Sequence, residues 1–148
     1  MSSGRRGRML CDMLRDVSPD HGAPITVIVA AGREGTRTAI ASVLDGAPGI
    51  HPAGVAADLS GTISLLRRSP PDVVVVDRSV LGDPALGRLS TFAALAPSTA
   101  FVVIGMGDHP GFAAAARAAG AADYVRLDDA SDRVAAAVSA AGSGVGGR

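Results

Sequence analysis

The sequence contains no lysine, asparagine, glutamine or tryptophan, and it has one cysteine and one tyrosine in 148 residues. The absence of lysine excludes mechanisms that use a lysine nucleophile or a phosphate-binding lysine, including the P-loop. A single cysteine excludes an internal disulfide and a metal site built from cysteines. The three histidines, His21, His51 and His109, lie far apart and lack the spacing of metal ligands. We expect His109 to be a surface residue of a turn.

Long apolar segments are also missing. No run approaches the roughly 20 residues that a transmembrane helix requires. Arg5, Arg6 and Arg8 precede a short apolar piece, but Asp12 ends that piece, so it does not make a convincing signal peptide. We therefore expect a cytoplasmic protein that does not associate with a membrane.

The charges of the chain are balanced, because 14 basic and 14 acidic residues give a formal net charge of zero. With no basic excess, we expect no direct binding of nucleic acid. The length suits one domain, and a hydrophobic content of 47% is sufficient for a packed core.

The most informative segment is Pro71–Asp77, in which the four valines Val73–Val76 stand between two aspartates. Such a run of β-branched residues predicts a short strand that is buried on both faces, in the middle of a parallel sheet. Asp77 would lie at the carboxyl end of this strand. In open α/β sheets, ligands bind at that edge.

Strand-like and helix-like segments alternate along the chain. Strands are predicted over residues 25–30, 50–56, 73–77, 100–104 and 123–127. Helices are predicted over residues 33–44, about 60–66, about 85–95, 112–119 and 131–141. The apolar side of the third helix is predicted to consist of Leu86, Leu89, Phe92 and Leu95.

This alternation predicts an α/β fold with a doubly wound, five-stranded parallel sheet in the flavodoxin-like order 2-1-3-4-5, with helices on both faces. Pro52 and Gly54 interrupt the second strand, which we therefore place at an edge of the sheet.

The predicted domain covers residues 24–141. Residues 1–23 are predicted to be a mobile arm. Apolar residues at helical spacing in this arm also predict a short amphipathic helix that lies on the domain or on a partner: Met9, Leu10, Met13, Leu14 and Val17. Residues 142–148 are predicted to be a flexible, glycine-rich tail.

Three segments, taken in their order and spacing, resemble the receiver domain of bacterial two-component response regulators, the CheY-like superfamily: Arg67–Asp77, Ala118–Tyr124 and Asp128–Ser131. The resemblance covers about residues 25–141 and is closest to receivers that precede a helix-turn-helix output domain. It implies a non-enzymatic role in phosphorelay signal transduction. The chain would act alone or be a fragment that lacks an output domain.

In that family, an aspartate at the end of strand three accepts a phosphoryl group, and two acids after strand one hold Mg²⁺. A hydroxyl residue ends strand four, and a lysine ends strand five. The resemblance assigns the acceptor position to Asp77, but Ala31 and Gly32 replace the acid pair, Gly105 the hydroxyl residue and Leu127 the lysine. A lone carboxylate is a poor Mg²⁺ site, and phosphoryl transfer needs a cation. We therefore predict a degenerate pseudo-receiver with no cofactor and no catalytic residue.

Other charged residues are predicted near the same edge. Asp83 and Asp108 could supply oxygens, although their positions favour turn and helix-cap roles. A half-buried carboxylate is costly without a partner. We therefore predict that Asp77 pairs with an arginine, and the competing interpretation is a hydrated Asp77. The candidate arginines are Arg126, which is the first choice, Arg78 and Arg33.

Tyr124 matches the aromatic switch position of receivers, where the ring moves with the state of the strand-four hydroxyl. Since Gly105 has no hydroxyl, the resemblance implies a locked Tyr124. Receivers dimerise through the face formed by their fourth helix, fifth strand and fifth helix, so we expect a protein partner or a second copy to bind there. The residues expected on this face are Ala115, Ala118, Tyr124, Arg126, Asp132 and Arg133.

Two alternatives stay open from the sequence. Receiver-like domains, often degenerate, also stand at the N-terminus of pilus-assembly ATPases of the TadZ/CpaE type. The other alternative is a small-molecule or nucleotide-binding α/β domain with a pocket above Asp77, beneath the loop Gly105–Gly111. The segment Gly32–Gly35 matches the dinucleotide fingerprint poorly, and no Gly-x-Ser-x-Gly supports a hydrolase.

Overall fold

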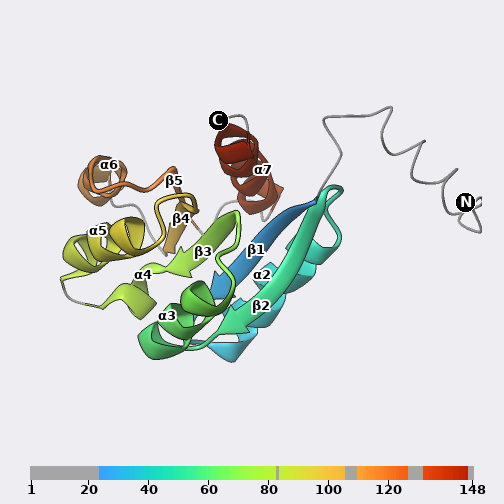
Figure 1. The fold of residues 1–148 in the computed structure, drawn as a ribbon, viewed down its shortest axis with the longest axis horizontal. Coiled ribbons are helices and arrows are strands. Elements are labelled where there is room, and N and C mark those ends of the chain that lie inside the picture. The colour runs from blue at the N-terminus through green and yellow to red at the C-terminus, as the bar shows by residue number, and fades with distance from the viewer. Residues whose placement is uncertain (1–23, 83, 106–109, 127–131, 147–148) are drawn as a thin grey trace, which may run out of the picture.

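The computed structural model describes residues 24–82, 84–105, 110–126 and 132–146, in which strands and helices alternate (Figure 1). The strands are β1 (Ile25–Ala30), β2 (Ile50–Ala56), β3 (Val73–Asp77), β4 (Ala100–Gly105) and β5 (Asp123–Arg126). The helices are α2 (Glu34–Asp45), α3 (Leu59–Arg68), α4 (Arg78–Leu81), α5 (Ala85–Leu95), α6 (Pro110–Ala118) and α7 (Asp132–Gly146).

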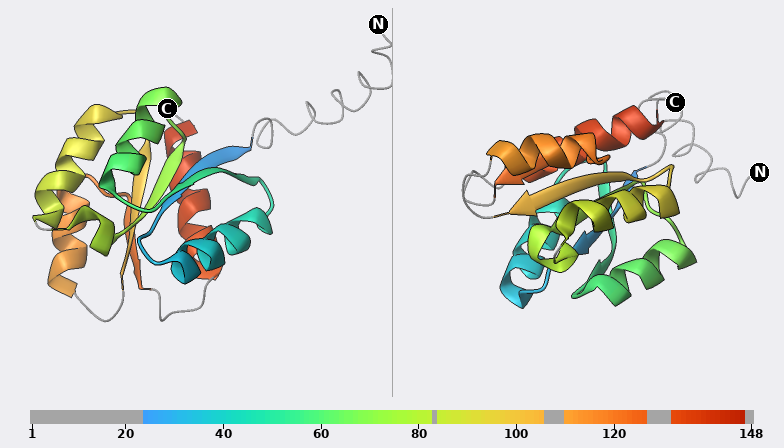
Figure 2. Two further views of the ribbon diagram at one scale, coloured as in Figure 1. Left: turned by 90° about the horizontal axis from the view of Figure 1, so that it is seen from below. Right: turned by 90° about the vertical axis from the view of Figure 1, so that its left-hand side faces the viewer.

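The strands form one parallel sheet in the order β2-β1-β3-β4-β5. Helices α2 and α7 pack on one face, and α3, α4, α5 and α6 contribute to the core on the other (Figure 2). The predicted strand order and the edge position of β2 are confirmed. The pairing of β1 with β2 shifts register between Val27 and Ile28, opposite Pro52 and Gly54, the two residues expected to interrupt that strand.

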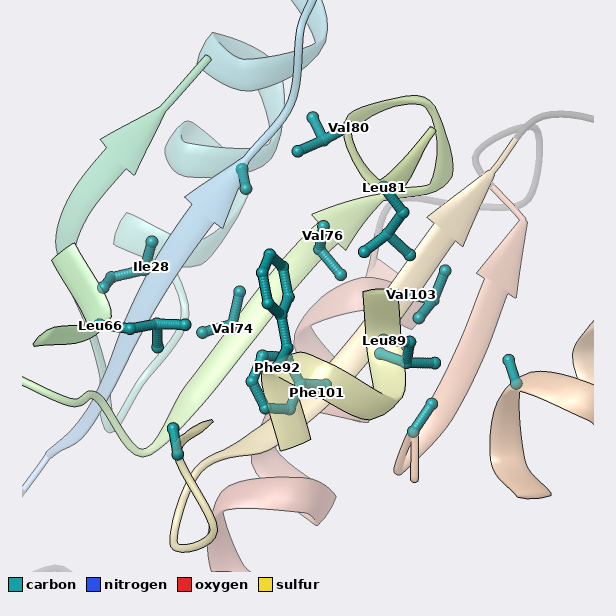
Figure 3. Close-up of a cluster of buried hydrophobic side chains, with 14 of the residues drawn as sticks. Ile28, Leu66, Val74, Val76, Val80, Leu81, Leu89, Phe92, Phe101 and Val103 are labelled. Atoms are coloured by element: carbon teal, nitrogen blue, oxygen red, sulfur yellow. The ribbon is translucent and has the colours of Figure 1, made fainter. Parts of the chain in front are cut away.

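Strand β3 lies at the centre of the sheet, and its four valines have no solvent exposure. Val74 and Val76 belong to the core that contains Phe92 and Phe101 (Figure 3). The alternate residues Val73 and Val75 belong to the core beneath α2 and α7. Burial of a valine side chain contributes roughly 1.5–3 kcal/mol, so this run attaches helices to both faces, as the sequence predicted.

The two aspartates that flank the valines have different roles. Asp72 ties the start of β3 to β1, because its Oδ2 accepts hydrogen bonds from the backbone N of Thr26 (3.0 Å) and from Thr26 Oγ1 (3.2 Å). The backbone N of Asp72 donates to Thr26 Oγ1 in return (3.0 Å). Asp77 ends the strand at the opposite edge. Only Asp77 is therefore placed at the edge where α/β sheets bind ligands.

Helix α4 was not predicted, since no helix or strand was assigned to residues 78–84. The helix has four residues and begins directly after β3. Its side chains Val80 and Leu81 are buried in the core, and Gly82 ends the helix with a positive φ of 71°. The burial of two apolar residues stabilises a helix that is too short to show a periodic pattern.

Helix α7 continues to Gly146, beyond the end predicted at Ala141. Gly142 is buried against β1, and a Cβ at this position would lie 2.7 Å from Cγ2 of Ile25. The glycine thus permits close packing of the helix on the strand and does not begin a tail there. None of the helices in the described ranges is both long and apolar enough to cross a membrane.

The predicted apolar side of α5 is correct for Leu89 and Phe92 but wrong for Leu95. Leu89 and Phe92 are 0% and 2% exposed, whereas Leu95 is 42% exposed. The ring of Phe92 also stacks on Phe101 with centroids 5.9 Å apart. Phe92 therefore anchors α5, and Leu95 lies at the surface.

We predict that Phe92→Ala lowers the free energy of unfolding by about 3–5 kcal/mol, because it leaves a cavity in the core. Leu95→Ala, in the same helix, should cost about 1 kcal/mol or less. Urea denaturation of both variants tests this difference, and equal losses would contradict the packing described for α5.

Candidate functional site

Asp77 lies where the sequence placed it, at the carboxyl end of the central strand. It pairs in register with Ile104 of β4. The side chain is half-buried, and its Oδ1 accepts a hydrogen bond from the backbone N of Ser79 at 3.1 Å. The carboxylate therefore caps the amino end of α4, which is a structural role that any aspartate at a helix start performs.

The positions after β1 carry no side-chain oxygen. Ala31 is fully buried and its backbone N donates to the carbonyl of Ala56 in β2 (3.0 Å), whereas Gly32 is exposed. The guanidinium of Arg37 binds this segment, because its Nη1 donates to the carbonyl of Ala31 at 2.8 Å and is 3.5 Å from that of Gly32. This turn is thus held by an arginine and offers no carboxylate to a metal.

Sequence reasoning missed Arg37. Its only signal was an arginine in the first turn of a helix that follows a strand, and such a position is compatible with an ordinary exposed side chain. The direction of the guanidinium, back toward the carbonyls of the preceding turn, becomes visible only in three dimensions.

Asp77 forms no ion pair with Arg33 or Arg78, and its carboxylate accepts the hydrogen bond from the backbone N of Ser79. Its pairing with Arg126 stays a prediction. Arg78 instead stacks on Phe112 of α6, with its Cζ 4.4 Å from the ring centroid. Arg33 is exposed at the start of α2. Arg126 is half-buried at the end of β5, next to Gly105 in the sheet register.

A magnesium ion does not fit the side chains that the structure describes at this edge. No three of the described His, Cys, Asp and Glu residues come together in a group that could hold a metal. Mg²⁺ in proteins needs several oxygen ligands. Asp77, at the end of β3, supplies one carboxylate. Asp83, Asp108 and Leu127, which the sequence also assigned to this site, lie outside the described residues, as do Met106–His109 of the predicted loop.

Tyr124 and Gly105 are in close contact across β5 and β4. Tyr124 is 8% exposed, and a Cβ at Gly105 would lie 2.5 Å from its hydroxyl oxygen. On the other side, the Tyr124 ring meets Phe112 edge to face, with centroids 5.6 Å apart. The tyrosine therefore fills the space that a side chain at position 105 would require.

A connected set of side chains thus links the end of β3 to β5. Arg78 stacks on Phe112, Phe112 packs on Tyr124, and Tyr124 lies against the backbone of Gly105. Cation–π and edge-to-face contacts of this kind contribute roughly 0.5–1.5 kcal/mol each. They stabilise the inward position of the tyrosine, and the locked state of its ring stays a prediction.

We predict that Gly105→Ala destabilises the protein by roughly 1–3 kcal/mol, because the new methyl group displaces the Tyr124 hydroxyl. In a Tyr124→Phe background the same change should cost less, since the nearest remaining ring atoms are 3.3 and 3.4 Å from the added Cβ. Urea unfolding of the four proteins in this double-mutant cycle measures the coupling.

Gly35→Ala is the matched control, because a Cβ at Gly35 meets no atom within 4 Å. This helical position should gain about 0.5–1 kcal/mol of stability. Equal costs of Gly105→Ala with tyrosine or phenylalanine at position 124 would show that the hydroxyl does not occupy this space.

No protein-family model matches the chain, and no curated protein matches it. Solved structures do. A LuxR-family two-component response regulator from Aurantimonas sp. SI85-9A1 matches with a TM-score of 0.75 and 21% identity, over 82% of this chain and 87% of that chain. The response regulator domain of Thermotoga maritima CheB matches with a TM-score of 0.70 and 18% identity, over 80% and 96% of the two chains.

The receiver domain of RcsB from Salmonella enterica serovar Typhimurium, solved in the presence of the phosphomimetic BeF3-, has a TM-score of 0.70 and 19% identity, over 76% of this chain and 84% of that chain. At identities this low, the structural similarity establishes the fold alone. The chemistry has to be argued from the residues of the site. The five-stranded order, the helices on both faces and these neighbours together show that the chain has the CheY-like fold of response-regulator receiver domains.

Proposed function

We propose that the chain is a receiver-like signalling module that works without phosphorylation, by binding a protein partner or a second copy of itself. One observation carries this proposal. The carboxylate at the acceptor position caps α4, while the two positions after β1 are Ala31 and Gly32 and carry no carboxylate. The receiver fold supports the signalling role, and the composition of the edge supports the independence from phosphate.

The physical reason lies in the charge that phosphoryl transfer brings. A phosphoryl group adds negative oxygens beside a carboxylate, and a divalent cation must neutralise them. At the end of β1, the available acceptors are backbone carbonyls, and Ala31 already accepts a hydrogen bond from Arg37. The positive guanidinium also disfavours a second cation at the same turn. A phosphorylated Asp77 would therefore lack the counter-charge that stabilises it.

The surface formed by α6, β5 and α7 is the proposed binding face. Ala118 and Arg133 are exposed on it, and Ala115 and Arg126 are half-buried. Tyr124 is buried beneath it, and Asp132 begins α7. Small side chains on α6 permit the close approach of another helix. A partner that binds here, or an output domain on that partner, would transmit the signal. Control of transcription would be one such output.

We predict that acetyl phosphate with Mg²⁺ produces no phosphoryl adduct in intact-protein mass spectrometry. Beryllofluoride with Mg²⁺ should leave the melting temperature unchanged, since only a ligand that binds the folded state raises it. A receiver with a complete acid pair, treated in parallel, verifies that the reagents are active.

Asp77→Asn is the matched variant for this experiment, because it removes the charge and keeps the shape of the side chain. Wild type and Asp77→Asn should behave identically toward both reagents. A wild-type adduct that disappears in Asp77→Asn would overturn the proposal.

We further predict that Ala118→Arg weakens self-association tenfold or more, about 1.4 kcal/mol, because it places a long charged side chain on the proposed face. Ala39→Arg is the control, since Ala39 is also an exposed helical alanine but lies on α2. Light scattering coupled to size-exclusion chromatography over a range of concentrations measures both. Equal effects of the two variants would exclude this face as the dimer interface.

A further inference from the structure

A shallow groove of about 400 Å³ runs between α2 and β2, at the β2 edge of the sheet (Figure 1). Arg37, Ala41 and Asp45 of α2 line one side of it, and Pro52 and Val55 of β2 line the other. The lining that solvent reaches is mainly apolar. Neither the site at Asp77 nor the proposed binding face accounts for this α2–β2 groove.

The α2–β2 groove exists because α2 does not cover the outermost strand. Val29 of β1 and Val55 of β2 are neighbours in the parallel register, so their side chains lie on the same face of the sheet. Val29 is 0% exposed in the core beneath α2 and α7, whereas Val55 is 51% exposed. A second helix laid beside α2 would bury Val55 and so continue the helical layer over β2.

The charged residues at the two ends of the groove are arranged symmetrically on α2. Arg37 and Asp45 are eight residues apart, about 12 Å along the helix axis, and Ala41 lies midway between them. A second α2 that runs antiparallel, with a two-fold axis at Ala41, places Arg37 of each copy beside Asp45 of the other. A parallel second helix would bring like charges together. The groove is therefore complementary to itself in one orientation.

Both charged groups are available for this pairing. The guanidinium of Arg37 has five N–H donors, and among the described residues only its Nη1 is engaged, with the carbonyls of the turn after β1. This contact also orients the guanidinium, which reduces the entropy that it loses on binding. Asp45 is exposed and forms no salt bridge with a described residue. The small side chain of Ala41 lets a second helix approach closely.

We propose that two copies of the chain bind each other through the α2–β2 groove, as an antiparallel two-fold pair in which α2 of each copy covers Val55 of the other. The charge pairs set the orientation, and the burial of apolar lining favours the association. The groove lies at the opposite edge of the sheet from β5. The pair therefore leaves the α6–β5–α7 face of each copy open to a partner, and it does not depend on the chemistry of Asp77.

A disulfide across the two-fold axis tests this pairing and reports on no other interface. Ala41→Cys in a Cys11→Ser background should give disulfide-linked dimers when the thiols are oxidised with diamide, because the axis brings the two new cysteines within disulfide range. Ala39→Cys is the matched control, since Ala39 is exposed on α2 but does not line the groove. Non-reducing electrophoresis measures the yield. No crosslink, or equal yields from the two variants, would overturn the proposal.

Charge reversal tests the orientation. When added to the Ala41→Cys chain, Asp45→Arg and Arg37→Asp should each lower the yield about tenfold, because each variant places like charges opposite one another. A mixture of the two variants should restore the yield, since opposite charges then meet between unlike chains. A mixture that crosslinks no better than its components would contradict the antiparallel pair.

A second comparison leaves Arg37 unchanged, because Arg37 also holds the turn after β1. Asp45→Asn removes the charge, and Asp45→Arg reverses it, so the reversal should lower the crosslink yield more than the neutralisation does. Equal yields from these two variants would contradict the charge pairing.

Ala118→Arg separates this inference from the proposed binding face. Ala118 is exposed on α6 and lies far from the groove in the strand order. In the Ala41→Cys chain, Ala118→Arg should therefore leave the crosslink yield unchanged, whatever it does to association through its own face. Loss of the crosslink would mean that the copies meet through the α6–β5–α7 face, and the groove proposal would fail.

Discussion

The burial of β3 on both faces is the constraint on which the rest of the structure depends. Four valines without solvent exposure require apolar helices above and below the sheet, and the two cores meet that requirement. A strand buried in this way must lie at the centre of a parallel sheet. The end of β3 therefore lies at the middle of the carboxyl edge of the sheet. Asp77 lies there because the four valines before it are packed in the two cores.

At the carboxyl edge of the sheet, contacts within the chain hold each of the described elements. Asp77 stabilises a short helix, and Arg37 stabilises the turn after β1 through its carbonyls. Arg78 and Phe112 hold Tyr124 inward against Gly105. Hydrogen bonds and ring contacts within the chain thus hold elements that a metal and a phosphate organise in phosphorylated receivers. Under the proposed function, we expect signalling to depend on binding partners.

The sequence predicted the sheet well because its signals are strong and local. The valine run identified the central strand, and the alternation of strands and helices identified the order. Leu95 was placed wrongly because a spacing of three residues drifts about 60° per step relative to a helix of 3.6 residues per turn. Helix α4 and the extension of α7 depend on burial against distant residues, such as Ile25, and local patterns do not contain that information.

The sequence showed which side chains are missing from the site, but it did not show which contacts the arginines near it make. Residue identity alone shows that Ala31 and Gly32 cannot supply carboxylates. It does not show where a long, flexible arginine side chain will point. Arg78 was therefore one of three candidate partners of the carboxylate although it stacks on an aromatic ring, and Arg37 was overlooked.

The most direct test of the central claim, that Asp77 does not hold a divalent cation, is a titration with Mn²⁺, the paramagnetic substitute for Mg²⁺, followed by NMR. We predict that the amide signals of Asp77 and Ser79 broaden no more than those of other half-buried or exposed residues. Saturable broadening centred on Asp77, and lost in Asp77→Asn, would contradict that claim.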